Sequence, residues 1–477
     1  MSIKKQTLVP VLLCLISMGC ASEHVMKPLD DKASVAKILA KDPTSTAFNA
    51  YLVEVGYPAE SLPLTSWGID ELTLCALFYH TKLDVAKQQL ALSELNIQAA
   101  GIRNAPSINA EFGQSNQKNG DLSPWLYGLS LNIPIETTNK RSIRIEKAEQ
   151  NVEVARMDLA EITWQFRNQI ATDLIAYHQN LAETQLLQQE VTTQESIVSM
   201  LEKRVNAGLA SSTELSNINL LTLKAKHQLN NKQTESQLLK AKLAADVGLT
   251  PENFAAIQIK PLAIENTLTQ QATVLEVPLE SKALQQEALL NRIDIRRSIA
   301  QYAAAETEIK LQVAQQTPDI SLNPGVLFEF GDKIWSLGFS SLLKLLHKDT
   351  ALVEQAKQLR AIQGAQFEDL QASVIAQINQ LHAHYQSAKQ ANQQAENTLK
   401  AEVAQKQKMQ KQFESGLIGK LEFAQYSLNT LIAKQQQLSA QFNLLTIANQ
   451  IENAMQKPIY TDFKLPNSTV TRLSSDE

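Results

Sequence analysis

The side chains that most often carry enzyme chemistry or bind metals are few and scattered in this sequence. Of the seven histidines, only His382 and His384 lie close together. Two residues apart on a helix, their side chains point about 200° away from each other, so they do not form a chelating pair. The sequence also lacks a Cys-x-x-Cys pair, a phosphate-binding loop and a nucleophile elbow. We therefore expect neither an enzyme nor a protein with a resident metal or cofactor.

A different set of candidate residues consists of an acid that recurs after a Gly-Leu pair. Residues 205–215 read VNAGLASSTEL, and residues 413–423 read FESGLIGKLEF. In both stretches the acid follows six residues after the glycine, and both interrupt long helical sequence. Because glycine tolerates a positive φ angle, the pattern predicts two similar helix-to-helix turns.

The N-terminus indicates an exported chain. It reads MSIKKQTLVPVLLCLISMGCAS, with a basic start and an apolar stretch too short to span a bilayer comfortably. The end of this stretch resembles a bacterial lipoprotein signal, with cleavage before Cys20 and acylation of its thiol. Ala21 implies sorting to the outer membrane, whereas Ser17 departs from the usual leucine. The alternative is an ordinary signal peptide with an incidental cysteine.

Composition limits the class of partner. The chain has 477 residues, 44% of them hydrophobic, and a net charge of −5, which argues against nucleic acid as the main partner. After the signal no apolar run of about 20 residues appears, so we expect no transmembrane helix. Cys14 would leave with the signal and Cys20 would be acylated, so Cys75 has no disulfide partner and most simply fills an apolar helix face.

Most of the mature chain repeats one pattern. WLYGLSL at 125–131 matches WSLGFSS at 335–341, and several other stretches recur at a similar distance. We divide the chain into a signal peptide (1–19), a lipid-anchored N-terminal segment (20–66), a first repeat (67–248), a proline-containing linker (249–282), a second repeat (283–457) and a C-terminal tail (458–477).

Two very long amphipathic helices are the strongest local signal. Residues 139–207 contain neither glycine nor proline, and residues 348–413 contain only Gly364. At a rise of 1.5 Å per residue, each helix would be about 100 Å long. Apolar residues recur in steps of three and four, as in a coiled-coil seam. The seam of the first helix comprises Ala148, Val152, Ala155, Leu159, Ile162, Phe166, Ile170, Leu174, Tyr177 and Leu181. By itself this pattern also fits a free coiled-coil rod.

Four stretches between these helices alternate apolar and polar residues, which indicates strands. They span residues 107–113, 125–133, 319–330 and 334–343. Each is about as long as a tilted transmembrane strand, and Trp125 and Trp335 suit a membrane interface. Four strands cannot close a barrel, and an open sheet edge cannot face lipid. Several chains would therefore have to share one barrel around an aqueous lumen.

The repeated order of helix, β-hairpin, long helix, Gly-Leu turn and helix resembles the TolC family of outer-membrane efflux proteins. Residues 67–113 resemble the opening helix and first strand of that family, and residues 205–229 and 413–438 resemble its two periplasmic hairpins. The resemblance covers about residues 65–457. It implies a mainly α fold with two repeats and a homotrimer, in which three chains share a twelve-stranded barrel continuous with a periplasmic helical tunnel.

The resemblance also implies passive export across the outer membrane. An inner-membrane pump, for which the RND type is one candidate, and a periplasmic adaptor (membrane fusion) protein would deliver the substrate. This protein would be the lipid-anchored exit duct in the outer membrane, with its tunnel projecting into the periplasm.

Two groups of site residues follow from the resemblance. Gly208 with Leu209 and Gly416 with Leu417 would form the hairpin tips that receive the adaptor. The alternative for each tip is a helix C-cap whose leucine packs on its own hairpin.

The second group would form a periplasmic gate. Glu214 and Glu422 would each give a ring of three carboxylates in a trimer, which favours cations. Phe413 matches an aromatic position of the closed-state network, but Gln425 replaces a second acid of the family. For Glu214 the alternative is compensation of charge at a helix N-terminus.

Residues 133–150 resemble the CzcC-like heavy-metal exporters within this family. Lys140 and Arg141 match a basic pair of that subclass, whereas Thr138 and Asn139 replace its usual glycines. We therefore lean towards metal export without naming a substrate.

Two other readings of the whole chain compete. A periplasmic adaptor would show one hairpin flanked by glycine-rich lipoyl and barrel segments, and this chain has two hairpins without such segments. A coiled-coil lipoprotein without a pore leaves the four alternating stretches unexplained.

Overall fold

The computed structural model describes residues 26–116, 123–262, 281–329, 331–341 and 350–458. The chain divides into two compact units, residues 1–41 and residues 42–477. In the first unit, helix α2 (Asp31–Leu39) begins where the Asp30 carboxylate accepts a hydrogen bond from the Ala33 amide at 3.0 Å. This is an ordinary N-cap, since the carboxylate satisfies an amide that has no partner within the helix.

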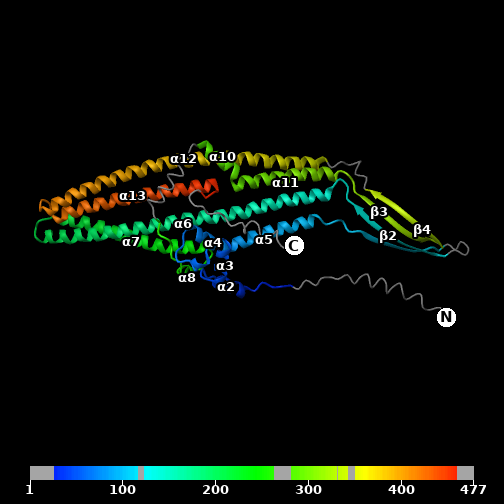
Figure 1. Cartoon of the computed structure of the whole chain (residues 1–477), viewed down its shortest axis with the longest axis horizontal. Coiled ribbons are helices and arrows are strands. Elements are labelled where there is room, and N and C mark those ends of the chain that lie inside the picture. The colour runs from blue at the N-terminus through cyan, green and yellow to red at the C-terminus, as the bar shows by residue number, and fades with distance from the viewer. Residues whose placement is uncertain (1–25, 117–122, 263–280, 330, 342–349, 459–477) are drawn as a thin grey trace. The chain divides into compact units, whose positions relative to one another are not determined.

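The second unit holds the other described elements, drawn in Figure 1. Its helices and strands, in chain order, are α3 (Thr46–Glu54), η1 (Ala59–Ser61), α4 (Ile69–Tyr79), α5 (Thr81–Ala100), β1 (Ser107–Gln114), β2 (Trp125–Ile135), α6 (Lys140–Asn206), α7 (Ser212–Asp246), α8 (Pro251–Phe254), α10 (Ser281–Asn291), α11 (Ile293–Gln315), β3 (Ile320–Glu329), β4 (Asp332–Ser341), α12 (Thr350–Glu414) and α13 (Lys420–Met455). The order of α5, β1, β2, α6 and α7 recurs as α11, β3, β4, α12 and α13.

The two long helices match the sequence prediction closely. Helix α6 has 67 residues and α12 has 65, so each is about 100 Å long. Most of the predicted seam of α6 is buried, with Leu159, Ile170 and Leu174 in the main hydrophobic core. The 3.6-residue period therefore identified the inner face of this helix correctly.

Helix α6 lies at the centre of the second unit. It packs against α5, α7, α11 and α13, while α12 packs against α13, α11 and α10. Figure 1 shows these helices running alongside one another, with the strands continuing from one end of them and the α6–α7 and α12–α13 turns at the other. None of the helices in the described part of the chain is both long enough and apolar enough to cross a lipid bilayer.

A small hydrophobic core forms where α3 and α4 pack beside α6. Phe48 and Leu52 of α3 are fully buried there, as is Cys75 of α4 on an apolar helix face. The segment after α8 joins this core, because Trp67 and Ile259 form a parallel β-bridge. This packing positions residues 251–262 against α6 and α7.

The four strands form a single sheet in the order β1-β2-β3-β4, and all three pairings are antiparallel. All four strands were predicted, with ends displaced by a few residues. Strand β2 runs two residues further than expected because Pro134 and Ile135 pair with Ser321 and Ile320. The predicted strand residues Phe330 and Leu343 lie outside the described residues.

Candidate membrane face and hairpin tips

One face of the sheet is apolar across all four strands. The pairing register places Ile108 beside Leu131 and Phe112 beside Tyr127 in the first hairpin. The same row continues into the second hairpin, where Tyr127 pairs with Phe328. The remaining apolar members of this face are Ala110, Trp125, Leu129, Ile133, Leu322, Val326, Trp335, Leu337 and Phe339. Because side chains alternate between faces, this register gathers the apolar positions of each strand on one side.

This apolar face is open to its surroundings in the single chain. Phe112 and Trp335 are each 72% exposed, and Phe339 is 70% exposed. A soluble protein rarely leaves so many large apolar side chains together on one surface, and such patches mark contact with lipid or with another protein.

The opposite face of the sheet is polar near the helices and mixed towards the turns, where Leu126, Leu327 and Ile334 also lie on it. Near the helices it presents serine, asparagine and glycine, and the Asn323 amide donates to the Ser340 hydroxyl at 3.1 Å. A Cβ atom at Gly128 or Gly325 would lie 2.9 Å from the end of a neighbouring side chain, so that side chain would have to shift. The row nearest the helices holds Pro134, Ser321 and Ser340, and the next two rows hold Ser107, Asn109, Ser130, Asn132, Asn323, Gly325, Ser336 and Gly338. These uncharged groups can hydrogen-bond to water.

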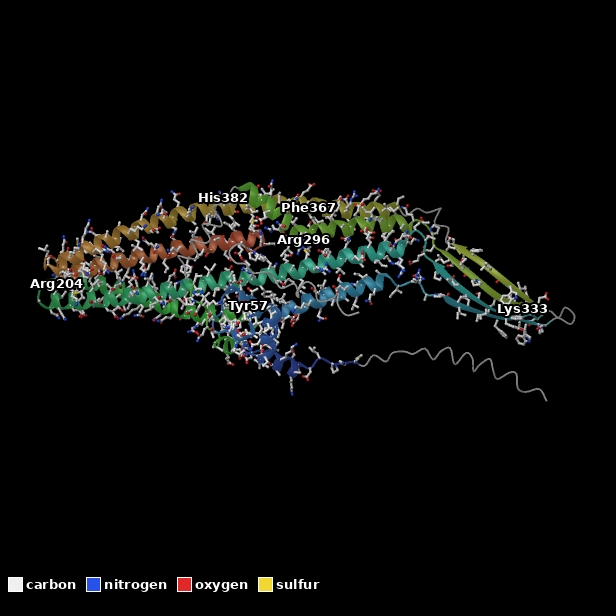
Figure 2. The ribbon with its side chains drawn as sticks, viewed as in Figure 1. Tyr57, Arg204, Arg296, Lys333, Phe367 and His382 are labelled. Atoms are coloured by element: carbon white, nitrogen blue, oxygen red, sulfur yellow. The ribbon has the colours of Figure 1, made fainter. Side chains whose placement is uncertain are left out.

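Aromatic residues gather toward the turn end of the apolar face. The rings of Phe112 and Trp125 are 5.3 Å apart, and those of Tyr127 and Phe328 are stacked at 4.8 Å. The Lys333 ammonium lies 4.9 Å from the centre of the Trp335 ring, at the end of the sheet seen in Figure 2. Aromatic rings with a lysine that reaches past them are typical of a membrane–water boundary.

Cationic side chains at the start of α6 join the sheet to the helices. Lys140 is buried, and its ammonium donates to the Asp319 carboxylate and the Thr317 carbonyl, each at 2.6 Å. Burial raises the pKa of Asp319, but hydrogen bonds from Lys140 and Thr137 outweigh it and hold the pKa below its ordinary value. Asp319 therefore stays ionised and fixes the end of α11 to the start of α6.

Two arginines make the matching junction with α5. Arg141 donates to the Gly101 carbonyl at 2.6 Å, and Arg144 donates to the Ala100 carbonyl at 3.3 Å while forming a two-pronged ion pair with Glu136. Cations at helix C-termini satisfy free carbonyls and complement the helix dipole. Sequence reasoning singled out Lys140 and Arg141 but did not identify their partners.

The turn before α6 explains another feature of the sequence. Thr138 and Asn139 have φ angles of 53° and 54°, in the left-handed region that favours glycine. The glycines that Thr138 and Asn139 replace would adopt this conformation without strain.

The two Gly-Leu turns have the same geometry. Gly208 and Gly416 have φ angles of 70° and 75°, as predicted for glycine at a helix end. The Leu209 amide donates back to the Arg204 carbonyl at 2.7 Å, and the Leu417 amide donates to the Gln412 carbonyl at 2.8 Å. Each turn is therefore a Schellman-type helix C-cap.

The two leucines project outward from these caps. Leu209 is 75% exposed and Leu417 is 76% exposed. The second part of the C-cap interpretation, in which each leucine packs on its own hairpin, is therefore wrong for the single chain.

A hydrophobic cluster holds the two tips side by side. Ile197 and Leu201 of α6 are buried with Leu421 of α13, and Leu215 of α7 packs against them. This cluster joins both hairpins within a few turns of their ends, so the tips form one composite surface.

The predicted gate residues lie at these tips. Glu214 and Glu422 are exposed in the first turns of α7 and α13, where a negative charge also suits the helix dipole. Phe413 stacks on Phe423 across the turn, with ring centres 5.3 Å apart and planes at 9°. Within the described residues, no group of three or more histidine, cysteine, aspartate or glutamate side chains is placed to hold a metal ion.

The sequence of this chain was also compared with those of known protein families. Residues 76–248, from α4 to the end of α7, match the model of the outer membrane efflux protein family. Over these residues the chain is similar to this family. The resemblance to the TolC family that we predicted from the sequence is confirmed. The matched residues lie within the predicted first repeat and end with it at residue 248.

A curated relative supports the same family. The Escherichia coli K12 outer membrane protein MdtQ, whose description as a multidrug resistance protein is itself provisional, is 21% identical over 345 residues. The alignment spans 66% of this chain and 66% of MdtQ, just under two thirds of each.

Solved structures share the fold over most of the chain. The outer-membrane channel OprN matches with a TM-score of 0.64 at 15% identity, covering 89% of this chain and 96% of OprN. VceC of Vibrio cholerae matches with a TM-score of 0.59 at 18% identity, covering 82% and 96%. The open state of MtrE of Neisseria gonorrhoeae matches with a TM-score of 0.62 at 16% identity, covering 82% and 89%. The fold of this chain is therefore that of these outer-membrane proteins.

Proposed function

We propose that this protein is the outer-membrane exit duct of a tripartite efflux system. Three copies would share one barrel and one helical tunnel, through which substrates leave passively. The observation that carries this proposal is the sheet, which presents an exposed apolar face and, in its helix-side half, an opposite face of serine, asparagine and glycine in register over four strands.

The sheet supports a trimer because it is incomplete alone. Strands β1 and β4 are its two edges, and edges with free backbone groups are not tolerated in lipid. Pairing β4 of one copy with β1 of the next would remove both edges, and three copies would give twelve strands. The apolar face would then contact lipid, and the serine, asparagine and glycine side would face a water-filled lumen.

The hairpin tips support docking of a periplasmic adaptor. Leu209 and Leu417 are exposed apolar side chains on rigid caps, held together by the cluster around Leu201. Exposed leucines on a fixed scaffold suit a partner that inserts an apolar helical surface. Energy for transport would come from an inner-membrane pump, since the chain carries no phosphate-binding loop. An RND-type pump is one candidate for this role.

The predicted lipid anchor at Cys20 is part of the proposal and lies outside the described residues. The lean towards a metal substrate gains no support, because Lys140 and Arg141 hold backbone carbonyls at the sheet junction. We therefore leave the substrate class of the duct open.

A pair of cysteine variants on β4 tests the barrel. Ser336 and Phe339 lie three residues apart on opposite faces of the strand. In the assembled protein in lipid, a membrane-impermeant thiol reagent should modify Ser336→Cys readily and Phe339→Cys slowly. Cys75 is buried and should not interfere. Equal, fast modification of both positions would show that neither face of the sheet contacts lipid.

A further inference from the structure

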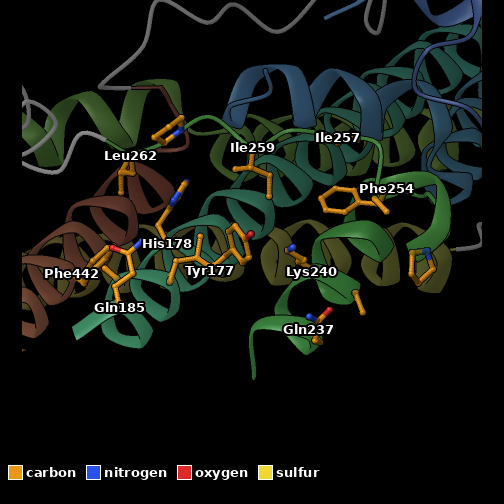
Figure 3. A pocket seen from close by; sticks show the side chains of 16 residues that line it. Tyr177, His178, Gln185, Gln237, Lys240, Phe254, Ile257, Ile259, Leu262 and Phe442 are labelled. Carbon is orange, nitrogen blue, oxygen red and sulfur yellow. The ribbon is translucent and has the colours of Figure 1, made fainter. Parts of the chain in front are cut away.

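A cavity of about 600 Å³ lies where the segment after α8 crosses α6 and α7. Figure 3 shows side chains from both helices and from this segment converging on the hollow, with Phe442 of α13 at one side. Its volume falls in the range of small-molecule sites in proteins. Neither the strands nor the hairpin tips contribute to it.

The cavity has an apolar floor and a polar rim. Tyr177, Phe254, Ile257 and Phe442 line the floor and are buried. Gln185, Gln237 and Lys240 line the rim and are exposed. A buried aromatic floor under a few polar groups fits a ligand with an apolar body and one polar end.

The charge of the cavity has one sign. No aspartate or glutamate is among the residues that line it, and Lys240 is its cation. The Lys240 ammonium lies 5.9 Å from the centre of the Tyr177 ring, and no carboxylate of the described residues forms an ion pair with it. By contrast, Lys232 and Lys242 on the same helix each pair with carboxylates at 2.6–2.9 Å.

His178 adds a neutral hydrogen-bonding group. Burial lowers the pKa of this histidine, so its imidazole is uncharged at neutral pH and can donate one hydrogen bond and accept another. It lies next to Tyr177 on α6, with ring centres 5.8 Å apart.

We propose that this cavity binds an amphipathic organic anion. The apolar body would lie on Tyr177, Phe254 and Ile257, and the anionic group would bind the Lys240 ammonium, with His178 as a second hydrogen-bonding partner. The site lies in the helical body of the protein, and the proposal does not depend on the chain being a duct.

Cysteine protection in the full-length protein tests the site. Gln185→Cys places a thiol on the rim, and Gln407→Cys places one on the exposed surface of α12, outside the cavity. The probes are 1-pyrenebutyrate and its uncharged counterpart 1-pyrenebutanol. We expect saturating 1-pyrenebutyrate to slow maleimide labelling of Gln185→Cys about tenfold and to leave Gln407→Cys unchanged.

The charge of Lys240 gives the decisive comparison. In the Gln185→Cys background, Lys240→Gln should weaken protection by 1-pyrenebutyrate about tenfold and leave protection by 1-pyrenebutanol unchanged, because a charge-assisted contact is lost. Lys226→Gln should change neither, since it removes another exposed cation of α7, one that is paired with Glu195 of α6. Equal protection by both probes, or protection that persists in Lys240→Gln, would overturn the proposal. So would a Gln185→Cys thiol that fails to react without any probe, since the cavity would then be closed in the assembled protein.

Discussion

Glu422 is an exposed acid in the first turn of α13, beside the stacked pair of Phe413 and Phe423. If three tips meet on one axis, three such carboxylates face a narrow opening and attract cations. We predict that Glu422→Gln lowers the ratio of cation to anion permeability in single-channel recordings. Glu368→Gln, which neutralises an exposed acid in the first third of α12, far from the tips, should leave the ratio unchanged. Unaltered selectivity in Glu422→Gln would remove this residue from the gate.

A carboxyl pair between α6 and α7 should respond to pH. The buried Asp173 accepts hydrogen bonds from Lys242 at 2.6 Å and from Gln169 at 2.7 Å, and its carboxylate also shares a hydrogen bond with Asp246. Two carboxyl groups share a hydrogen bond only when one of them holds a proton. Burial, together with the hydrogen bond and charge of Asp173, raises the pKa of Asp246 to about 7.

The sign of the pH effect follows from that shift. Asp246 binds its proton more tightly in the folded protein, so its contribution to stability is complete below pH 3.8 and is lost as the pH rises through about 7. Because Asp246 is only half-buried, we expect a change on the order of 1–2 kcal/mol, or about tenfold in an opening equilibrium.

Hydrogen exchange across pH tests this pair. After correction for intrinsic rates, the amides of residues 242–249 should lose about tenfold protection between pH 5 and pH 8 in the native protein. Asp246→Asn should abolish this dependence, since an asparagine amide donates to Asp173 at every pH. The amides around Ile170 in mid-α6 serve as the internal reference. A pH dependence that survives in Asp246→Asn would assign it to another group.

The contacts of individual residues were the feature of this structure that the sequence predicted least well. The Phe413 partner, Phe423, could have been found from the sequence, because folding the chain at Gly416 brings the two rings together. Asp173 and Asp246 are 73 positions apart and have no local pattern that pairs them. The cavity is likewise assembled from segments that only tertiary packing brings together.

The helices and strands were predicted far better than individual contacts, because each follows a local periodicity of apolar residues in the sequence. Alternation in steps of two identified all four strands, and steps of three and four identified α6 and α12. The register across strands was not predictable in this way. It depends on contacts between distant segments, such as the junctions where Lys140, Arg141 and Arg144 tie α6 to the ends of α11 and α5.

The two hairpin tips should be essential for export because they would dock the adaptor. Leu209→Asp combined with Leu417→Asp should abolish export of a pump substrate in cells, because charged tips cannot bury themselves in an apolar adaptor surface. Both leucines are exposed, so the trimer should remain intact in detergent. Leu209→Met with Leu417→Met, which keeps the tips apolar, should retain export. Full export by the aspartate variant would mean that the tips do not dock the adaptor through these residues.

At the scale of the whole molecule, the single chain leaves sheet edges and apolar surfaces without a partner in the described structure. Its sheet leaves two open edges and an apolar face exposed, and α5, α7 and α12 also carry exposed leucines. Three chains would cover the edges by strand pairing and leave the apolar face to lipid. Because each chain contributes two hairpins with their tips held together, the same assembly would close a tunnel of helices.

Single-channel conductance of the detergent-extracted protein in planar bilayers, with its mass in detergent determined alongside, tests this account most directly. The account predicts a particle of three chains that inserts and gives discrete, cation-selective conductance steps. A chain that stays monomeric in detergent and gives no conductance would contradict it, because neither the barrel nor the tunnel could then form.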